Sequence, residues 1–464
     1  MSLRQALVRV HRWVGLAIAL FLVVAGLTGS VIAFNHELDE WLNPDLFRVQ
    51  SRGAPISSLD LAARVEAAEP RLRVTYVPLH VEDGHALVLG VAGRGDPTSG
   101  TPDDLGYDEV FLNPITGARL GERKWGSCCF ERKQLIPFLY SVHYSLHLPE
   151  VWGLWVMGTI ALVWMLDCFV GFYLTLPRRK GRGARGEVPG GSEGRGAQGT
   201  KSDSRPSFWR RWKPAWKVKL GARPYRVNFD LHRAGGLWFW GLLFTVAVSG
   251  VYLTLQFEVF RPVLSLVMPI TPSPFEELRP APETAGDDPA VSFTTIVATA
   301  TQEAARRGWQ PPFDAFYSPE FGVYGVGFGD HHAPGTGVPF LYFDQHSGRV
   351  LGQTVPGEGT AGDVFMQWMF PLHSGQIIGL PGRIVISITG LVVALLSATG
   401  VVIWAKKRRG RRAISMRAPR VEAVPTLGVA SSFSASRGEQ SAPAAHSIRS
   451  AMTGSTRVAR RAGR

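Results

Sequence analysis

The chain has 464 residues, of which 45% are hydrophobic and 19% are charged, and its formal net charge is +13. A mean hydropathy of +0.05 in a chain with this many charges indicates a membrane protein with sizeable soluble parts. Three cysteines without a Cys-X-X-Cys motif disfavour a disulfide scaffold, a structural zinc site and covalently attached c-type haem. The basic charge would suit nucleic-acid binding only if it lay on a soluble face.

Four apolar stretches are long enough to cross a bilayer as helices, which takes roughly 20 residues. We expect transmembrane helices over residues 13–34, 143–176, 227–256 and 371–404. The first apolar run is too long for a signal peptide and ends in Asn-His-Glu, so we interpret it as an uncleaved anchor.

The basic residues are concentrated in segments 1–12, 178–226 and 405–464, which hold 32 of the 50 basic and 5 of the 37 acidic residues. Their net charge is +27, whereas the rest of the chain carries −14. Because basic segments stay on the cytoplasmic side, we expect both termini and the loop 177–226 to be cytoplasmic. Residues 35–142 and 257–370 are then on the outer side of the membrane, and the case for nucleic acid is removed.

The basic loop is rich in Gly and Ser between residues 181 and 204, and the tail 405–464 has few large apolar residues after Val421. Both segments are predicted to be disordered. Trp209, Trp212 and Trp216 alternate with basic residues, which suits either nucleic-acid stacking or contact with the anionic inner leaflet. We favour the leaflet, because the segment directly precedes a span.

The chain contains two copies of one unit, each made of a span, an outer domain and a second span. His11 opens the first span and His232 the third, and glycines recur at matching positions after both. His143 and His373 lie near the starts of the second and fourth spans, and a glycine near the end of each span follows them at nearly equal separation. These glycines are Gly15 and Gly29, Gly236 and Gly250, and, for the second and fourth spans, Gly171 and Gly400. The sequence therefore predicts a four-transmembrane-helix bundle built from two repeats.

The outer domains repeat as well. Residues 110–117 and 340–348 run from apolar, strand-like residues into a turn that begins with Asn113 or Asp344 and has a glycine four residues later, which predicts a β-hairpin in each. Residues 59–68 and 294–307 have helical spacing. We expect each outer domain to be one helix on a small antiparallel sheet.

The repeat places the four histidines at two depths, with His11 level with His232 and His143 level with His373. A b-type haem needs two imidazoles at equal depth on opposite sides of a helix bundle, without covalent attachment. Two pairs therefore predict two haems b across the membrane. A single histidine at a span boundary would favour an ordinary interfacial residue, but two matched pairs favour haem.

Other residues are candidates for the same sites. His147, four residues after His143, is an alternative ligand. Arg12 and Arg233 either pair with haem propionates or mark the cytoplasmic boundary. Asp167 is costly in a bilayer and is expected to face the bundle interior, as a proton-coupling or haem-neighbouring group or as a buried hydrogen-bonding group. The small residues Gly15, Gly29 and Gly236 would let a flat macrocycle approach the backbone.

The remaining cysteines and histidines are assigned lesser roles. Cys128 and Cys129 lie on the oxidising side, as a labile disulfide or as separate thiols. Cys168 is interpreted as ordinary packing. His36 has no counterpart in the second half, and we interpret His331, His332 and His346 as solvated loop residues.

The span motifs resemble those of the PepSY-associated transmembrane helix family of bacterial inner-membrane proteins. The resemblance covers residues 8–408 and includes His-Arg-Trp-Val-Gly-Leu from His11, Leu-His-Arg around His232, Ser-Val-His-Tyr-Ser-Leu-His over 141–147 and Pro-Leu-His-Ser-Gly around His373. The first outer turn departs from the usual Asp, because it carries Asn113.

The family includes ferric-siderophore reductases with two b haems, so the resemblance implies that His11 with His232 and His143 with His373 are axial ligands. It implies an inner-membrane oxidoreductase that reduces a periplasmic ferric siderophore or other ferric chelate. The chain has no nucleotide-binding Gly-X-Gly-X-X-Gly motif in a suitable setting, so electrons would come from a quinol or a separate cytoplasmic donor. The alternatives are a membrane-anchored PepSY protein that binds or regulates periplasmic peptidases and, last, a transporter, which we disfavour because broken spans are not evident.

Overall fold

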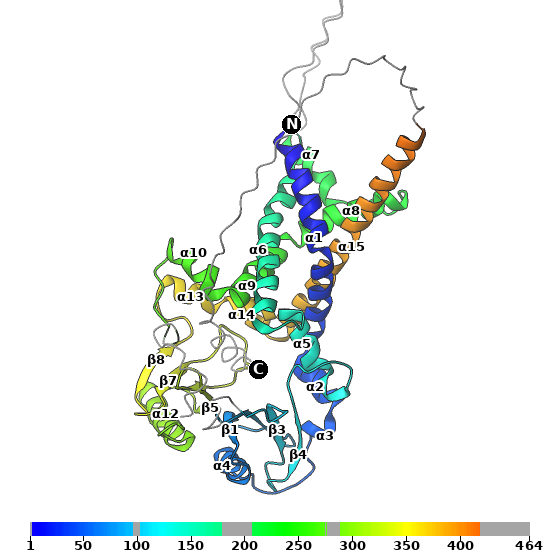
Figure 1. Ribbon diagram of the computed structural model, residues 1–464. Coiled ribbons are helices and arrows are strands. Elements are labelled where there is room, and N and C mark those ends of the chain that lie inside the picture. Colours follow the sequence, from blue (N-terminus) through cyan, green and yellow to red (C-terminus); the bar gives the residue numbers. More distant parts are fainter. Residues whose placement is uncertain (1, 96–102, 179–206, 274, 276–287, 418–464) are drawn as a thin grey trace, which may run out of the picture.

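The computed structural model describes residues 2–95, 103–178, 207–273, 275 and 288–417. Long helices form one part of the molecule and an antiparallel sheet with two covering helices forms the other (Figure 1). The segment 181–204 and the tail beyond residue 421, for which we predict disorder, lie outside the described residues.

The first half of the chain begins with a long helix and ends with one. Its helices are α1 (Leu3–Ile32), α2 (Asn35–Leu42), α3 (Pro44–Phe47), α4 (Ser58–Ala68), the 3₁₀ turn η1 (Arg132–Gln134), α5 (Leu135–Ser145) and α6 (Glu150–Thr175). Its strands are β1 (Leu72–Pro78), β2 (Leu87–Gly93), β3 (Glu109–Leu112) and β4 (Arg119–Arg123).

The second half follows the same general order. Its helices are α7 (Phe208–Trp212), η2 (Lys213–Trp216), α8 (Pro224–Trp238), α9 (Trp240–Thr254), the π-helical turn η3 (Gln256–Phe260), α10 (Arg261–Ser265), α12 (Phe293–Arg307), α13 (Ala361–Gln367), α14 (Met369–Ser374), η4 (Gln376–Ile378) and α15 (Leu380–Arg417). Its strands are β5 (Pro312–Ser318), β6 (Val323–Phe328), β7 (Phe340–Asp344) and β8 (Val350–Thr354).

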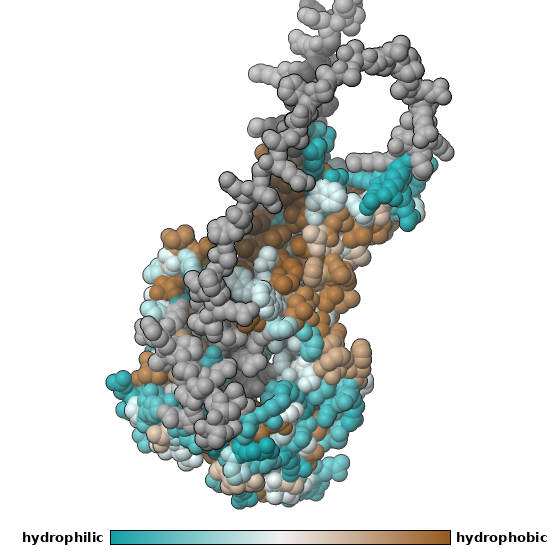
Figure 2. Space-filling model, in the orientation of Figure 1, coloured by the Kyte–Doolittle hydropathy of each residue, from teal (hydrophilic) through white to brown (hydrophobic). Residues whose placement is uncertain are grey.

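Within the described part of the chain, three helices are long and apolar enough to cross a membrane, namely Leu3–Ile32, Val151–Thr175 and Leu380–Gly410. The pair α8 and α9 passes the same test only when it is taken together. Hydrophobic residues cover these helices, whereas hydrophilic residues cover most of the sheet and the opposite ends of the helices (Figure 2). The chain is therefore a multi-pass membrane protein in contact with the lipid bilayer.

The third apolar stretch is not the single helix that we expect over residues 227–256. α8 and α9 are bent by 68° at Phe239, so the sequence-based premise that no span is broken is wrong. α8 carries Arg226, Asp230 and Arg233, which favour the bilayer surface, whereas α9 is apolar. The change of direction falls where the polar helix meets the apolar one.

The helices of the second and fourth spans begin later than expected from residues 143–176 and 371–404, at Glu150 and Leu380. His143 lies on α5, which ends at Ser145, and α6 begins only after Pro149, whose ring cannot continue a helix. His373 lies on α14, which ends at Gly375 with a φ of +83°, a left-handed conformation that suits glycine. The first helix, in contrast, begins at Leu3 rather than residue 13, with Ser2 and Gln5 forming a capping box.

The strands form one eight-stranded sheet in the order β4-β3-β2-β1-β5-β6-β7-β8. Both predicted hairpins (β3–β4 and β7–β8) and both predicted helices (α4 and α12) are present. Asn113 Oδ1 accepts from the amides of Ile115 and Thr116, as Asp344 Oδ1 accepts from those of His346 and Ser347. Asn113 thus makes the same turn as Asp.

The two outer segments do not form the two separate small sheets that we expect. β1 pairs with β5 in antiparallel fashion, with Tyr76 opposite Phe316 and Val77 opposite Ala315. We call this contact the seam. The strands on either side of the seam pack against α4 and α12 in two separate apolar cores. The seam joins the two halves of the chain through backbone hydrogen bonds.

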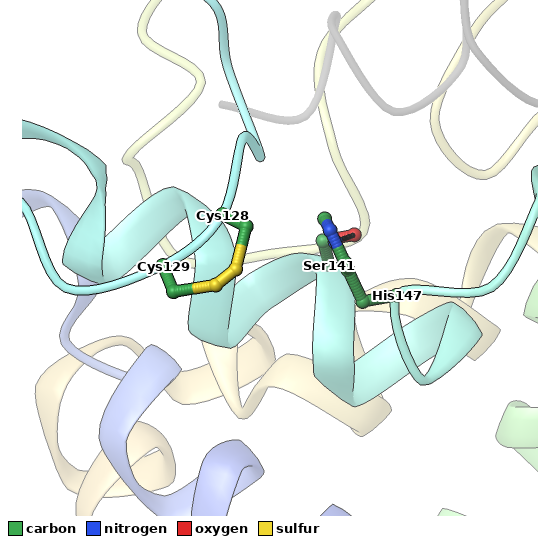
Figure 3. Close-up of a disulfide and its surroundings, with 4 residues drawn as sticks. All are labelled: Cys128, Cys129, Ser141 and His147. Carbon is green, nitrogen blue, oxygen red and sulfur yellow. Dashed lines mark hydrogen bonds between the residues drawn. A yellow bond between two sulfur atoms is a disulfide. The ribbon is translucent and has the colours of Figure 1, made fainter.

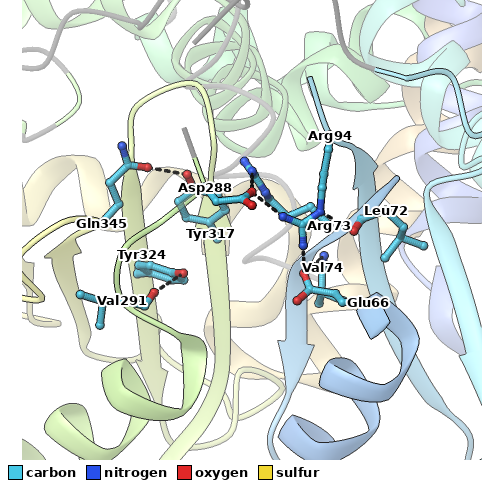
Figure 4. A network of polar contacts seen from close by, with 10 residues as sticks. All are labelled: Glu66, Leu72, Arg73, Val74, Arg94, Asp288, Val291, Tyr317, Tyr324 and Gln345. Atoms are coloured by element: carbon cyan, nitrogen blue, oxygen red, sulfur yellow. Dashed lines mark hydrogen bonds and ion pairs between the residues drawn. The ribbon is translucent and has the colours of Figure 1, made fainter. Parts of the chain in front are cut away.

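Polar side chains reinforce the seam (Figure 4). Arg73 of β1 is 7% exposed and forms an ion pair with Asp288, which precedes α12 and also pairs with Arg94. Arg73 also lies over the ring of Tyr317, 5.6 Å from its centre. Because these partners come from both halves, the network holds the two apolar cores in one orientation.

Two contacts connect the sheet to the helices. Arg123 of β4 is buried and lies 2.8 Å from Asp39 of α2 and 2.5 Å from Glu109 of β3. Burial raises the pKa of Asp39, and the two carboxylates raise the pKa of Arg123. At the start of α15, Arg383 donates to Glu37 (2.6 Å) and to the carbonyl of Ala33 (2.7 Å).

Candidate functional site

The four histidines lie in two facing pairs. His11 of α1 and His232 of α8 have ring centres 6.2 Å apart, with ring planes at 53°. His143 of α5 and His373 of α14 have ring centres 6.1 Å apart, at 62°. We call the first the distal pair, because α8 and the start of α1 lie away from the sheet, and the second the sheet-side pair, because α5 and α14 lie on the side of the sheet (Figure 1).

The spacing within each pair suits two imidazoles on one metal ion. Each coordinating nitrogen would lie roughly 2 Å from the metal and roughly 1 Å from its own ring centre, so the ring centres would be about 6 Å apart. Among the described residues, no group of three or more His, Cys, Asp or Glu side chains is arranged to hold a metal. A pair of imidazoles without further protein ligands would suit a metal that brings its other ligands with it, as a haem iron does.

Every one of the four rings is held through Nδ1. His11 Nδ1 lies 2.8 Å from Asp167 Oδ2, and His373 Nδ1 lies 2.9 Å from Ser249 Oγ. The nearest acceptors of the other two rings are backbone carbonyls, at 3.0 Å, from Ala25 to His143 and from Leu396 to His232. Anchoring of this kind fixes the tautomer in which Nε2 carries the lone pair, as metal-ligating histidines require.

A glycine of a neighbouring helix packs against the edge of every ring. A Cβ atom would lie 2.8 Å from His143 at Gly29, 3.2 Å from His232 at Gly400, 3.4 Å from His11 at Gly171 and 3.8 Å from His373 at Gly250. Gly29 therefore makes room for a histidine ring. A Cβ atom added to Gly15 or Gly236 would have no heavy atom within 4 Å among the described residues.

Arg12 and Arg233 follow the two distal histidines in the chain. The Nε atoms of both are buried, and neither has a hydrogen-bond partner among the described residues. Arg233 is otherwise paired with Asp230 (2.8 Å), whereas Arg12 lies over the ring of Trp13. Two buried donors beside the distal pair suit an acidic ligand group such as a propionate.

His147 is not part of either pair. Its φ of +55° turns the chain away from α5, and its Nδ1 lies 3.3 Å from Ser141 Oγ (Figure 3). The same view contains Cys128 and Cys129, which are joined by a disulfide. His36 and His332 contact each other, with ring centres 5.0 Å apart.

The remaining histidines and the tryptophan segment also have identifiable surroundings. His331 lies 3.2 Å from the buried carboxylate of Asp314 on β5, so it is not the solvated residue that we expect. His346 has its Nε2 2.9 Å from the amide of Gln345. Trp212 is buried against Phe172 of α6, whereas Trp209 is exposed.

An apolar groove of about 750 Å³ runs between α1 and α15 near the distal pair. Trp13 and Trp404 stand at one end of it, and the remaining lining residues are Leu16, Ala17, Ala19, Leu20, Val23, Ser397, Ala398 and Val401. Its location on two membrane-spanning helices makes it accessible from the lipid.

Asp167, which we expect in the bundle interior, is buried and anchors His11, but sequence reasoning missed the hydroxyl groups that anchor the other three rings. Thr28, Ser249 and Thr399 each lie within 3.2 Å of a histidine Nδ1, and each directly precedes one of the glycines that pack on that ring. A Ser/Thr-Gly dipeptide in three of the four apolar stretches is a signal that could have identified them.

The fold and site define a multi-pass membrane protein with an antiparallel α+β domain and two facing histidine pairs. The sequence profile of the PepSY-associated TM region matches residues 8–407, and the chain belongs to this family. No curated protein matches the chain.

Proposed function

We propose that the chain is a two-haem inner-membrane oxidoreductase that moves electrons across the membrane to a periplasmic ferric chelate. The single observation that carries this proposal is the geometry of the two pairs, each with Nδ1-anchored rings about 6 Å apart. Haem iron accepts and passes on one electron at a time. A peptidase-regulating membrane anchor would give no reason for two such pairs.

The repeat supports placing the two pairs near opposite faces of a four-span bundle. His11 and Gly29, against which His143 packs, lie toward opposite ends of the same helix, α1. At 1.5 Å per residue, the helix between them rises about 27 Å, close to the thickness of the hydrocarbon core. We infer that the third span comprises α8 and α9 together, with α8 at the bilayer surface.

The charge distribution supports the orientation. Basic residues flank the distal pair, among them Arg4, Arg9, Lys406 and Lys407, so this end faces the cytoplasm by the positive-inside rule. The sheet then lies in the periplasm beside the sheet-side pair. Electrons would enter at His11 and His232 and leave at His143 and His373.

The chain's own residues have separate tasks in this proposal. His11, His232, His143 and His373 would be the axial ligands, and Arg12 and Arg233 would pair with propionates at the distal site. The groove between α1 and α15 favours a quinol as the donor, because it is apolar and opens to the lipid. A bent span also occurs in transporters, but residues 237–241 at this bend include no charged group to bind an ion.

The iron chelate is the part of the proposal that rests on resemblance to ferric-siderophore reductases. We expect reduced protein in liposomes to be reoxidised by an external ferric chelate, with ferrous iron captured by a chromogenic chelator.

The decisive experiment is the absorbance spectrum of the full-length protein purified in detergent, oxidised and dithionite-reduced. Two b haems per chain, quantified as the pyridine haemochrome, are expected. Protein that folds in a haem-replete host and has no Soret band would overturn the proposal.

A further inference from the structure

The four ring anchors follow one pattern, with one exception. Counted from the packing glycine, Nδ1 bonds the backbone carbonyl four residues earlier and the hydroxyl one residue earlier. The carbonyl of Ala25 and the hydroxyl of Thr28 hold His143 in this way, at 3.0 and 3.2 Å. Leu396 and Thr399 hold His232 at 3.0 and 3.1 Å.

His373 follows the pattern through the backbone of Val246 and the hydroxyl of Ser249. The groups that anchor these three rings in this pattern are all neutral.

His11 is the exception. The residue before its glycine is Val170, which has no hydroxyl, and the residue four positions before is Asp167. Here the side chain replaces the backbone carbonyl, because Asp167 Oδ2 lies 2.8 Å from His11 Nδ1. The carboxylate is 9% exposed, and its Oδ1 is buried without a hydrogen-bond partner among the described residues.

A carboxylate and a carbonyl act differently on a ligating histidine. A carboxylate that accepts from Nδ1 makes the imidazole a more basic ligand, and its charge also favours the more positive, oxidised state of a nearby metal. Both effects lower the reduction potential, and they add. A carbonyl or hydroxyl supplies the hydrogen bond without the charge.

We propose that Asp167 is a positioning residue that gives the distal site the lower reduction potential of the two. This inference rests on the proposed function. One electron from the quinol donor would then pass from the distal pair to the sheet-side pair along a falling free energy, oxidising the first site by one electron and reducing the second by one. The single carboxylate anchor thereby sets the direction of transfer toward the sheet.

The test is a redox titration of the full-length, haem-loaded protein, followed by absorbance and by low-temperature electron paramagnetic resonance. Asp167→Asn keeps a hydrogen-bonding group but removes the charge. We expect the lower of two midpoint potentials to rise by at least the 59 mV that corresponds to a tenfold change for one electron, and the higher one to stay. Asp167→Glu should restore most of the difference.

Two further variants keep the result interpretable. The double variant Asp167→Leu/Val170→Thr installs at His11 the neutral arrangement that holds His232, so it should bind haem and bring the two potentials together. The matched control Thr399→Val removes a neutral bond within the same site and should shift the potential much less.

The outcomes separate the two proposals. Wild-type protein without haem would overturn the proposed function. Two haems with unchanged midpoints in both Asp167 variants, or a shift confined to the higher midpoint, would overturn the role of Asp167 alone.

Discussion

A Cβ atom added to Gly29 would lie 2.8 Å from Cε1 of His143, closer than such atoms approach in proteins. The contact joins α1 to the sheet-side pair, and it leaves no room for a side chain at this position unless His143 moves. We predict that Gly29→Ala displaces His143 and lowers sheet-side haem occupancy at least tenfold, measured as haem per chain. Gly241→Ala, at an exposed position of α9 where an added Cβ atom has nothing within 4 Å among the described residues, is the control and should bind two haems. Full occupancy in Gly29→Ala would contradict the packing argument.

Each histidine pair is expected to serve one haem. His232→Ala should remove the distal haem and His373→Ala the sheet-side haem, so each variant retains about one haem per chain in the pyridine haemochrome assay. His147→Ala is the matched control, because His147 lies outside both pairs and is expected to leave the content unchanged. Loss of both haems, or of neither, in a folded single variant would argue against these pairings.

The groove between α1 and α15 makes a separate prediction about the donor. Ser397→Trp places a large side chain in the groove and should slow reduction by a quinol at least tenfold, measured by stopped-flow absorbance. Reduction by dithionite should be unaffected, because it does not use the groove. Leu391→Trp, at an exposed α15 position outside the groove lining, is the control. Equal quinol rates in both tryptophan variants would exclude the groove as the entry point.

The two halves are predicted to depend on each other for haem. Every pair takes one histidine from before residue 178 and one from after residue 207, and the seam joins the halves. A chain cut between residues 178 and 207 should therefore copurify as two co-expressed fragments with two haems. Either fragment alone should lack the spectrum of a six-coordinate haem. Separate purification of a fragment with that spectrum would contradict the split-site arrangement.

The ion pair between Glu37 and Arg383 predicts a pH effect on stability. The hydrogen bond from Arg383 lowers the pKa of Glu37 below its ordinary value near 4.5. Its stabilisation is therefore present above that value and is lost as the pH falls through the lower, folded-state pKa. Glu37 is 55% exposed, so we expect Glu37→Gln to cost less than about 1 kcal/mol at pH 7 and less still at pH 3. Thermal unfolding at both pH values measures this, and an equal loss at both would contradict the assignment.

Local patterns predicted much of the site and little of the connectivity. The positions of His11 and His232 within the repeat indicated their pairing, and Asn113 and Asp344 indicated the hairpins. Helix spacing and turn type both depend on residues that are close together in the sequence. The seam involves strands from opposite halves of the chain, and strand alternation does not specify which edges meet. The groups that anchor the histidine rings could be predicted only in part, for a different reason. A backbone carbonyl such as that of Leu396 carries no sequence signal, whereas the hydroxyl beside it does.

The helix breaks were obscured by composition. Pro149 and Gly375 are residues that commonly end a helix. Apolar residues nevertheless continue on both sides of them, so the sequence resembles one continuous helix in each case. Phe239, at the 68° bend, is not a residue that ends helices, and tertiary packing decides the direction there.

The distribution of each histidine pair over two halves of one chain also bears on the cost of Asp167. A symmetric dimer of a single half would present the same residue at both anchors of the distal site, and two carboxylates would then have to be desolvated close together inside the membrane. One continuous chain escapes this duplication. It can keep a charged anchor on His11 and a neutral one on His232. One buried charge then lowers the reduction potential of the distal site without the repulsion that two carboxylates would cause.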